Sequence, residues 1–174
     1  EAVATQDTSG GVPAIESPLL DLLPHAETDA GSVRSLDIGL CPATAQALRA
    51  IGVGTEALVA LALVAAESWF TGNGEVLASM LADGRVRQVR VGNGGEAARD
   101  VLDLLSNTPC TNDAAPCVWV AGEGEDVPAF AASRWQLDLA RGVLRVVFRA
   151  PLSGPGAAHL GDAVFHALQA IARN

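Results

Sequence analysis

Residues 132–150 read ASRWQLDLARGVLRVVFRA, and they predict two strands joined by a tight turn. Aromatic, β-branched and polar residues run on both sides of Ala140-Arg141-Gly142, where a glycine suits the turn of a hairpin. Residues 155–172 follow with the apolar spacing of an amphipathic helix. The end of the chain therefore predicts an antiparallel hairpin with a helix packed back on it.

Working outward from this hairpin, we expect two more strands and several helices. Residues 85–91 alternate valine with arginine, which predicts a half-exposed strand, and residues 117–120 predict a short one. A helix is expected over 96–106 between them. Further helices are expected over 42–50, 55–70 and 75–82, and the apolar body of the second, residues 57–66, predicts a central buried helix. The order is N-terminal helices followed by β-α-β-β-β-α, an α+β fold with a mainly antiparallel four-stranded sheet and helices packed on one face.

The chain divides into an irregular N-terminal arm, residues 1–32, and a single domain, residues 33–174. Prolines, glycines and small polar residues are frequent in the arm, which is typical of irregular structure. Four leucines between two prolines interrupt it, at positions Leu19, Leu20, Leu22 and Leu23. Such a cluster docks on a core, and we favour the chain's own core over that of a partner.

Composition excludes several classes of partner. The 174 residues carry a net charge of -9, and arginine supplies all 11 basic side chains. Nucleic-acid backbones and anionic membrane surfaces attract basic patches, so we expect neither as a partner. The longest apolar run, residues 57–66, is far shorter than the roughly 20 residues of a membrane-spanning helix. The absence of lysine beside abundant alanine, glycine and arginine suggests a bacterial source with a GC-rich genome.

Cysteine placement suggests an oxidising compartment. Cys110 and Cys117 bracket a six-residue polar loop, short enough for a disulfide to close. With the missing initial methionine, this pair favours an exported or periplasmic protein. Three unrelated thiols in a cytoplasmic protein are the alternative, and no nearby ligand completes a zinc site. Cys41 is expected to be a buried thiol or to pair with another chain.

A glycine-rich motif offers one candidate ligand site. Gly92, Gly94 and Gly95 lie between a predicted strand and a predicted helix and fit G-x-G-x-x-[GA], the pattern that cradles a pyrophosphate. The arginine-rich strand before it and the absence of further βαβ units favour a simple turn.

The last predicted helix offers a candidate metal site. His159, Asp162 and His166 share one face of it, at spacings that suit a divalent metal. A solvated helix face is the more common reading of such a stripe. His25 is the one further histidine, and the arm would have to fold across to bring it near.

Partner contacts are expected on the sheet. Trp119 and Trp135 lie on predicted strands, where an exposed face would mark a binding surface and core packing is the alternative. Arg87 stands with other strand arginines that would form a local basic patch on the open face, suited to an acidic peptide or a small anion.

No catalytic constellation and no cofactor are evident in the sequence. We therefore predict a non-catalytic protein-binding module, an exported or envelope-associated bacterial accessory subunit whose partner is another protein or peptide. A homo-oligomer stays open. The alternative is an enzyme or enzyme subunit that binds a phosphate-bearing ligand at the Gly92–Gly95 turn.

Overall fold

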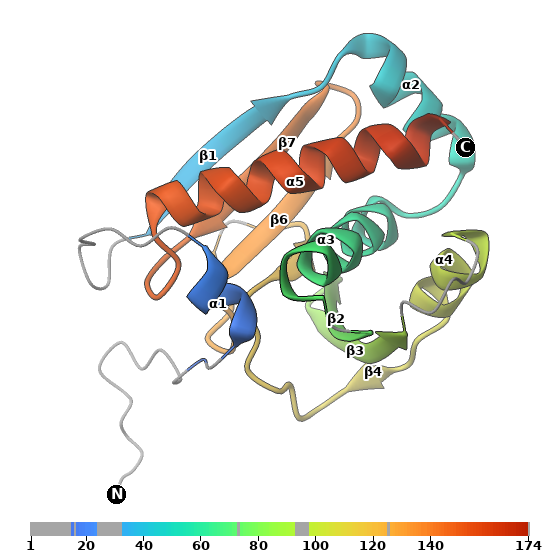
Figure 1. Cartoon of the computed structure of the whole chain (residues 1–174). Helices are drawn as coiled ribbons and strands as arrows, with labels where there is room; N and C mark the ends of the chain where they lie inside the picture. The colour runs from blue at the N-terminus through green and yellow to red at the C-terminus, as the bar shows by residue number, and fades with distance from the viewer. Residues whose placement is uncertain are drawn as a thin grey trace, which may run out of the picture.

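The structure is a computed structural model that describes residues 15, 17–23, 33–72, 74–92, 98–124 and 126–173. Its elements, shown in Figure 1, are α1 (Pro18–Leu22), β1 (Arg34–Gly39), α2 (Pro42–Ile51), α3 (Thr55–Thr71), β2 (Glu75–Ala82), β3 (Arg85–Gly92), α4 (Ala98–Ser106), β4 (Cys110–Thr111), β5 (Val120–Gly122), β6 (Ser133–Asp138), β7 (Val143–Phe148) and α5 (Gly154–Arg173).

The strands form one mixed seven-stranded sheet in the order β1-β7-β6-β5-β2-β3-β4. β5 runs parallel to both of its neighbours, and every other adjacent pair is antiparallel. The α+β class is confirmed, but the expectation of four strands is wrong. The expected strand over 117–120 begins later, at Val120, while Cys117 makes an isolated parallel bridge to Ala131.

The β6–β7 hairpin is confirmed as the sequence predicts, with Ser133 opposite Phe148 and Asp138 opposite Val143. β1 adds to it as an antiparallel edge strand, with Arg34 opposite Phe148. This strand was not predicted, because its six residues include a charged pair and a terminal glycine and carry no long apolar run. Pairing with β7 places them in the sheet.

The expected helix over residues 75–82 is wrong, because this segment is the strand β2, paired antiparallel with β3. A short apolar run does not by itself distinguish a buried strand from a buried helix. The turn that follows does distinguish them. Asp83 and Gly84 both have positive φ, at 53° and 73°, and Asp-Gly is a preferred two-residue hairpin turn.

The two long helices cover one face of the sheet (Figure 1). α3 packs on β2, β5 and β6, and α5 packs on β1, β7 and α3 itself. The body of α3 is buried on all sides, as its apolar sequence predicts, and Gly54 is the N-cap residue of this helix. The expected packing of helices on one face is confirmed for these two.

The described part of the N-terminal arm docks on the chain's own core. Ser17 caps the short helix α1, accepting a hydrogen bond from the backbone N–H of Leu19 at 3.2 Å. Leu19, Leu20 and Leu23 are buried in the main core, and Leu22 is 52% exposed. Three of the four leucines are therefore covered by the chain itself. The remaining arm residues lie outside the described ranges.

Within the described ranges, no single helix is both long and apolar enough to cross a membrane. α2 and α3 reach the necessary length and composition only when taken together, and they are bent by 110° at their junction. Ten residues of α3 are buried inside the protein, which is typical of a core helix.

Candidate functional site: an aromatic hollow between two helices

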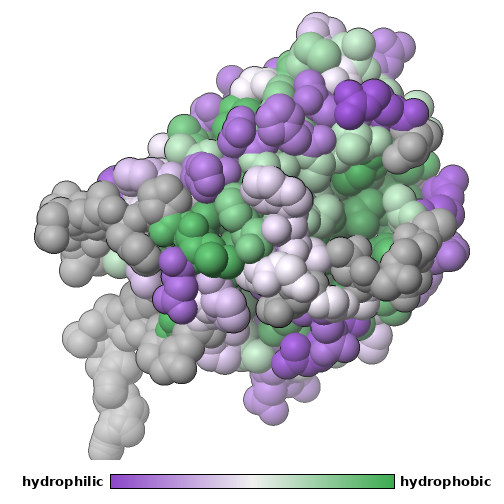
Figure 2. All heavy atoms as spheres, in the orientation of Figure 1, coloured by the Kyte–Doolittle hydropathy of each residue, from purple (hydrophilic) through white to green (hydrophobic). Residues whose placement is uncertain are grey.

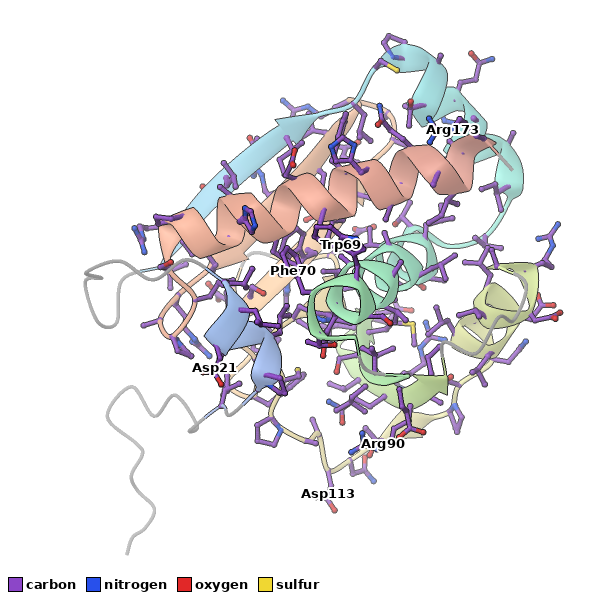
Figure 3. The ribbon with its side chains drawn as sticks, in the orientation of Figure 1. Asp21, Trp69, Phe70, Arg90, Asp113 and Arg173 are labelled. Carbon is purple, nitrogen blue, oxygen red and sulfur yellow. The ribbon has the colours of Figure 1, made fainter. Side chains whose placement is uncertain are left out.

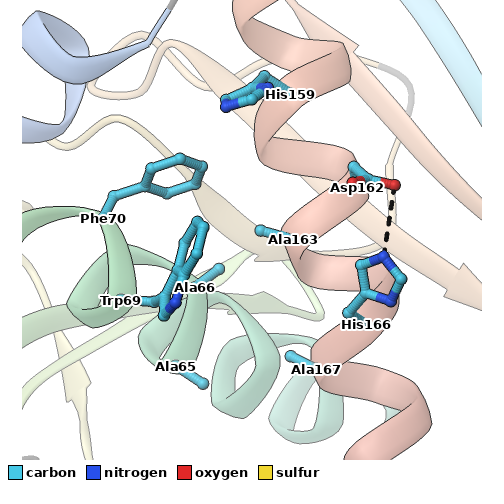
Figure 4. Close-up of a pocket in the computed structure, with 9 residues that line it drawn as sticks. All are labelled: Ala65, Ala66, Trp69, Phe70, His159, Asp162, Ala163, His166 and Ala167. Atoms are coloured by element: carbon cyan, nitrogen blue, oxygen red, sulfur yellow. Dashed lines mark ion pairs between the residues drawn. The ribbon is translucent and has the colours of Figure 1, made fainter.

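A surface hollow lies where the last turns of α3 meet α5 (Figure 4). Its volume is about 340 Å³. We call it the aromatic hollow and define it by nine lining residues, four from α3 and five from α5: Ala65, Ala66, Trp69, Phe70, His159, Asp162, Ala163, His166 and Ala167. Its floor and walls are mostly alanine and aromatic carbon, and its polar groups lie along α5.

Trp69 dominates the hollow because α3 leaves the core just before it. The helix is buried continuously from Ala57 to Val64, and its last turns then reach the surface. The Trp69 side chain is 75% exposed, the most exposed large apolar side chain among the described residues. Figure 3 shows Trp69 and Phe70 between α3 and α5, and Figure 2 shows pale and green atoms there, bordered by purple atoms along α5.

The rings at the hollow form a continuous aromatic edge. Trp69 meets Phe70 edge-on, with ring centroids 5.0 Å apart. Phe70 in turn lies against the His159 imidazole, at 5.4 Å between ring centroids. The Trp69 indole thus packs edge-on against Phe70 at its base, while most of Trp69 is exposed to solvent.

The polar rim pairs Asp162 with His166, whose Nε2 lies 3.7 Å from the Asp162 carboxylate. Both side chains are exposed, so the pair contributes little to stability. His159 points toward Phe70 in Figure 4, away from this pair. Among the described residues no three His, Cys, Asp or Glu side chains group as metal ligands. Metal binding by His159, Asp162 and His166 stays a prediction.

Trp119 and Trp135 lie in the core, so the predicted exposed tryptophan face is wrong. Both are essentially unexposed. The Trp119 indole donates to Glu67 Oε1 at 2.8 Å, and the Trp135 indole donates to Ser133 Oγ at 2.9 Å. The core alternative that the sequence allowed is the one observed.

Glu67 is a carboxyl group whose pKa is changed by its surroundings. It lies on α3, on the side that faces Trp119 and the sheet. Burial raises the pKa of Glu67, and the hydrogen bond from Trp119 opposes that rise in part. The Glu67 charge also acts on the nearby buried thiol of Cys117.

Arg87 is committed to internal contacts and does not present a free basic group. Its guanidinium lies 3.2 Å from the Glu56 carboxylate. It also donates to the backbone carbonyls of Leu105 and Ser106 at the end of α4. Arg87 therefore ties β3 to the start of α3 and stabilises the C-terminus of α4, where a positive charge suits the helix dipole. Its predicted role in a partner patch is not supported by this geometry.

The predicted disulfide does not form in this structure, where Cys41, Cys110 and Cys117 are free thiols. Cys110 is exposed in the short edge strand β4, whereas Cys117 is buried beside Ser79. Burial raises the pKa of Cys117 to about 11. Cys41 is exposed, contrary to the buried thiol expected of it.

The glycine motif falls mostly outside the described residues. Gly92 ends β3, and Gly94 and Gly95 are not described. β3 runs antiparallel to both β2 and β4. A dinucleotide fingerprint follows a parallel strand, so this context differs from the one the motif requires. Phosphate binding at this turn stays a prediction.

Sequence reasoning missed the aromatic hollow, although two signals for it were present. Trp69 follows an apolar run that fills α3, and a helix buried on all sides must emerge at one end. The histidine stripe of α5 was noted as a helix face, but nothing in one sequence shows that Trp69 and Phe70 pack beside it. That juxtaposition comes from the tertiary contact between α3 and α5.

No sequence family and no curated protein matches this chain. Solved structures do match its fold. The cyclization–docking bidomain of the nonribosomal peptide synthetase EpoB from Sorangium cellulosum matches at a TM-score of 0.59 and 10% identity, over 89% of this chain and 47% of that one. The first condensation domain of the calcium-dependent antibiotic synthetase, in complex with a substrate analogue, matches at 0.56 and 16%, over 87% and 46%.

The epimerization domain from the third module of tyrocidine synthetase B matches at a TM-score of 0.55 and 13% identity, over 97% of this chain and 53% of that one. The chain therefore spans about half the length of these structures. Its fold resembles about half of these condensation, cyclization and epimerization domains. At these identities the likeness concerns the fold alone.

Proposed function

We propose that this chain is a non-catalytic protein-binding module that holds a polypeptide partner at the aromatic hollow. The single observation behind this proposal is the 75% exposed Trp69 side chain beside a preformed apolar recess. Tryptophan is among the residues that most often dominate the energy of protein interfaces.

The likeness to half of a condensation domain supports this proposal. In a complete domain, some surface of each half faces the remaining half. By analogy, we propose that this chain also has a surface that meets other polypeptide. The aromatic hollow is the strongest candidate among the described residues, because it combines a recess with an exposed aromatic side chain.

The proposed role is that of an accessory subunit, and this role does not require the exported or periplasmic location that the sequence predicts. The expectation of export combined the missing initial methionine with a disulfide between Cys110 and Cys117, and both cysteines are free thiols here. The binding role does not depend on that pair, because neither cysteine lines the aromatic hollow.

The proposal is tested by site-specific photo-crosslinking in the protein's own host. A photoreactive phenylalanine analogue replaces Trp69 in one variant and Leu104 in a matched control. Leu104 is also exposed, but it lies on α4, away from the hollow. We expect a polypeptide adduct from position 69 and none from position 104. The identified polypeptide, once purified, should bind the wild-type chain and lose affinity for Trp69→Ala.

Failure of the proposal would be equally clear. Equal adducts from both positions would indicate general surface contact. The absence of any adduct from position 69, in a variant that melts as the wild type does, would also remove the proposal.

A further inference from the structure

We infer that the partner seated in the aromatic hollow is a second copy of this chain, with each Trp69 indole inserted into the hollow of the other copy. This inference rests on the proposed function, because it names the partner of that same surface. It commits to a two-fold symmetric pair, the most common arrangement of soluble homo-oligomers.

The shape of the surface is self-complementary. A two-fold interface uses the same patch on both chains, so a projection must lie beside a recess that accepts it. Trp69 is such a projection, since three quarters of its side chain is exposed, and it borders a recess of about 340 Å³. Ala163 and Ala167 on α5 and Ala66 on α3 line that recess, and their small side chains leave room for an indole.

The polar rim is also self-complementary. The Asp162 carboxylate would oppose an acidic partner, whereas the imidazoles of His159 and His166 offer N–H donors to a carboxylate. A second copy turned by 180° brings both the acceptor and the donors, so the Asp162 carboxylate of one chain can accept a hydrogen bond from an imidazole of the other. The net charge of -9 opposes association at long range. Salt screens that repulsion within about 8 Å at physiological ionic strength, so contacts at the rim decide the outcome.

Analytical ultracentrifugation of the full chain tests the inference over roughly 5 to 500 µM. We expect the wild type to pass from monomer to dimer in this range. Trp69→Ala removes the projection, and Ala163→Phe fills the recess. Each should raise the dissociation constant at least about thirtyfold, the effect of removing an interface hot spot. Leu104→Ala removes an exposed apolar side chain elsewhere and should leave the constant unchanged.

A mixing experiment tests whether each Trp69 indole inserts into the hollow of the other copy. The intact indole of Ala163→Phe can enter the open recess of Trp69→Ala, so an equimolar mixture should dimerise more tightly than either variant alone. Thermal melting confirms that each variant is folded, and Ala167→Leu replaces Ala163→Phe if the latter melts early. A mixture no tighter than its components, or a Leu104→Ala effect as large as that of Trp69→Ala, would overturn the exchange.

The inference and the proposed function fail in different ways. A wild type that stays monomeric to about 500 µM overturns the second copy as partner. If position 69 then crosslinks to a different polypeptide, the binding module stands with another partner. If position 69 gives no adduct at all, both are wrong.

Discussion

At the scale of single residues, the Glu67 carboxyl is a source of pH-dependent stability. Its pKa is raised by burial, so the folded chain holds the Glu67 proton more tightly than the unfolded chain does. At pH values below the pKa that Glu67 has in the unfolded chain, the carboxyl is protonated in both states, and Glu67 does not lower the free energy of unfolding. As pH rises through the unfolded pKa and then the folded pKa, ionisation destabilises the fold.

We therefore expect Glu67→Gln to melt above the wild type at pH 7.5, by a few degrees, and level with it near pH 4. Glutamine keeps an oxygen to accept the Trp119 hydrogen bond, so the comparison isolates the charge. Thermal unfolding followed by circular dichroism measures the difference. A variant that melts below the wild type across this range would show that Glu67 stabilises the fold as a carboxylate.

The three thiols should differ in their rates of alkylation, because their surroundings differ. The pKa of Cys41 is lowered, first by a hydrogen bond with the Thr44 hydroxyl, where Sγ and Oγ1 lie 3.0 Å apart, and then by the backbone of the first turn of α2. The pKa of Cys117 is raised to about 11 by burial. Thiolates are the reactive form, so alkylation follows these shifts.

With iodoacetamide at pH 7.5 we expect Cys41 to label first and Cys117 to stay unmodified in the folded chain. Thr44→Ala should slow Cys41 labelling a few-fold, because it removes the hydroxyl that stabilises the thiolate. Peptide mass spectrometry over time gives the three rates. Labelling of Cys117 as fast as Cys41 would contradict the burial of Cys117. If neither Cys110 nor Cys117 could be labelled even in the unfolded chain, the predicted disulfide between them would be supported after all.

At the scale of elements, the loop after β5 depends on one close approach. Gly124 has φ of +148°, and a Cβ there would overlap the Nη1 of Arg134. Arg134 is buried, with 6% of the residue exposed, and its Nη1 donates to the carbonyl of Glu123 at 3.1 Å. The loop thus lies directly over a buried arginine of β6 and cannot do so with a side chain at position 124.

Gly124→Ala should therefore destabilise the chain by about 2 kcal/mol, through backbone strain and displacement of Arg134. Gly39→Ala is the matched control, because nothing lies within 4 Å of a Cβ at that position and its backbone is ordinary. It should change stability by less than about 0.5 kcal/mol. Urea unfolding measures both, and equal effects would refute the contact.

The short helix α1 is held by its buried leucines rather than by its own length. Five residues do not form a stable helix in isolation, so packing on α3 must hold it. Leu19→Ala should cost about 2 to 5 kcal/mol, as in a fully buried core position. Leu22→Ala should cost less than about 0.5 kcal/mol, since Leu22 is half exposed. Equal losses in urea unfolding would mean that α1 is not part of the core.

At the scale of the whole molecule, the sequence predicts individual helices and strands better than it predicts which of them pair or pack together. The β6–β7 hairpin and the helices α2, α3 and α5 follow from turn residues and apolar spacing, which are local signals. β1 and β4 owe their place to pairing with β7 and β3, which no local signal contains. The Asp83-Gly84 turn was a local signal for β2 that the helix prediction overlooked.

The candidate site shows the same division. The stripe on α5 with His159, Asp162 and His166 is visible in the sequence, where it predicts either a solvated helix face or a metal site. What makes it a rim is the packing of α3 beside α5, which brings Trp69 and Phe70 to the same recess. Of three tryptophans, the two placed on strands are buried and the one on the helix is exposed. Burial depends on the sheet's two faces, which one sequence does not reveal.

The most direct measurement is the crosslinking comparison between positions 69 and 104. The account predicts a specific polypeptide adduct from position 69, which is lost when Ala163→Phe fills the recess, and no adduct from position 104. No adduct from position 69 in a folded chain, or equal adducts from the two positions, would contradict the claim that the aromatic hollow is a binding surface.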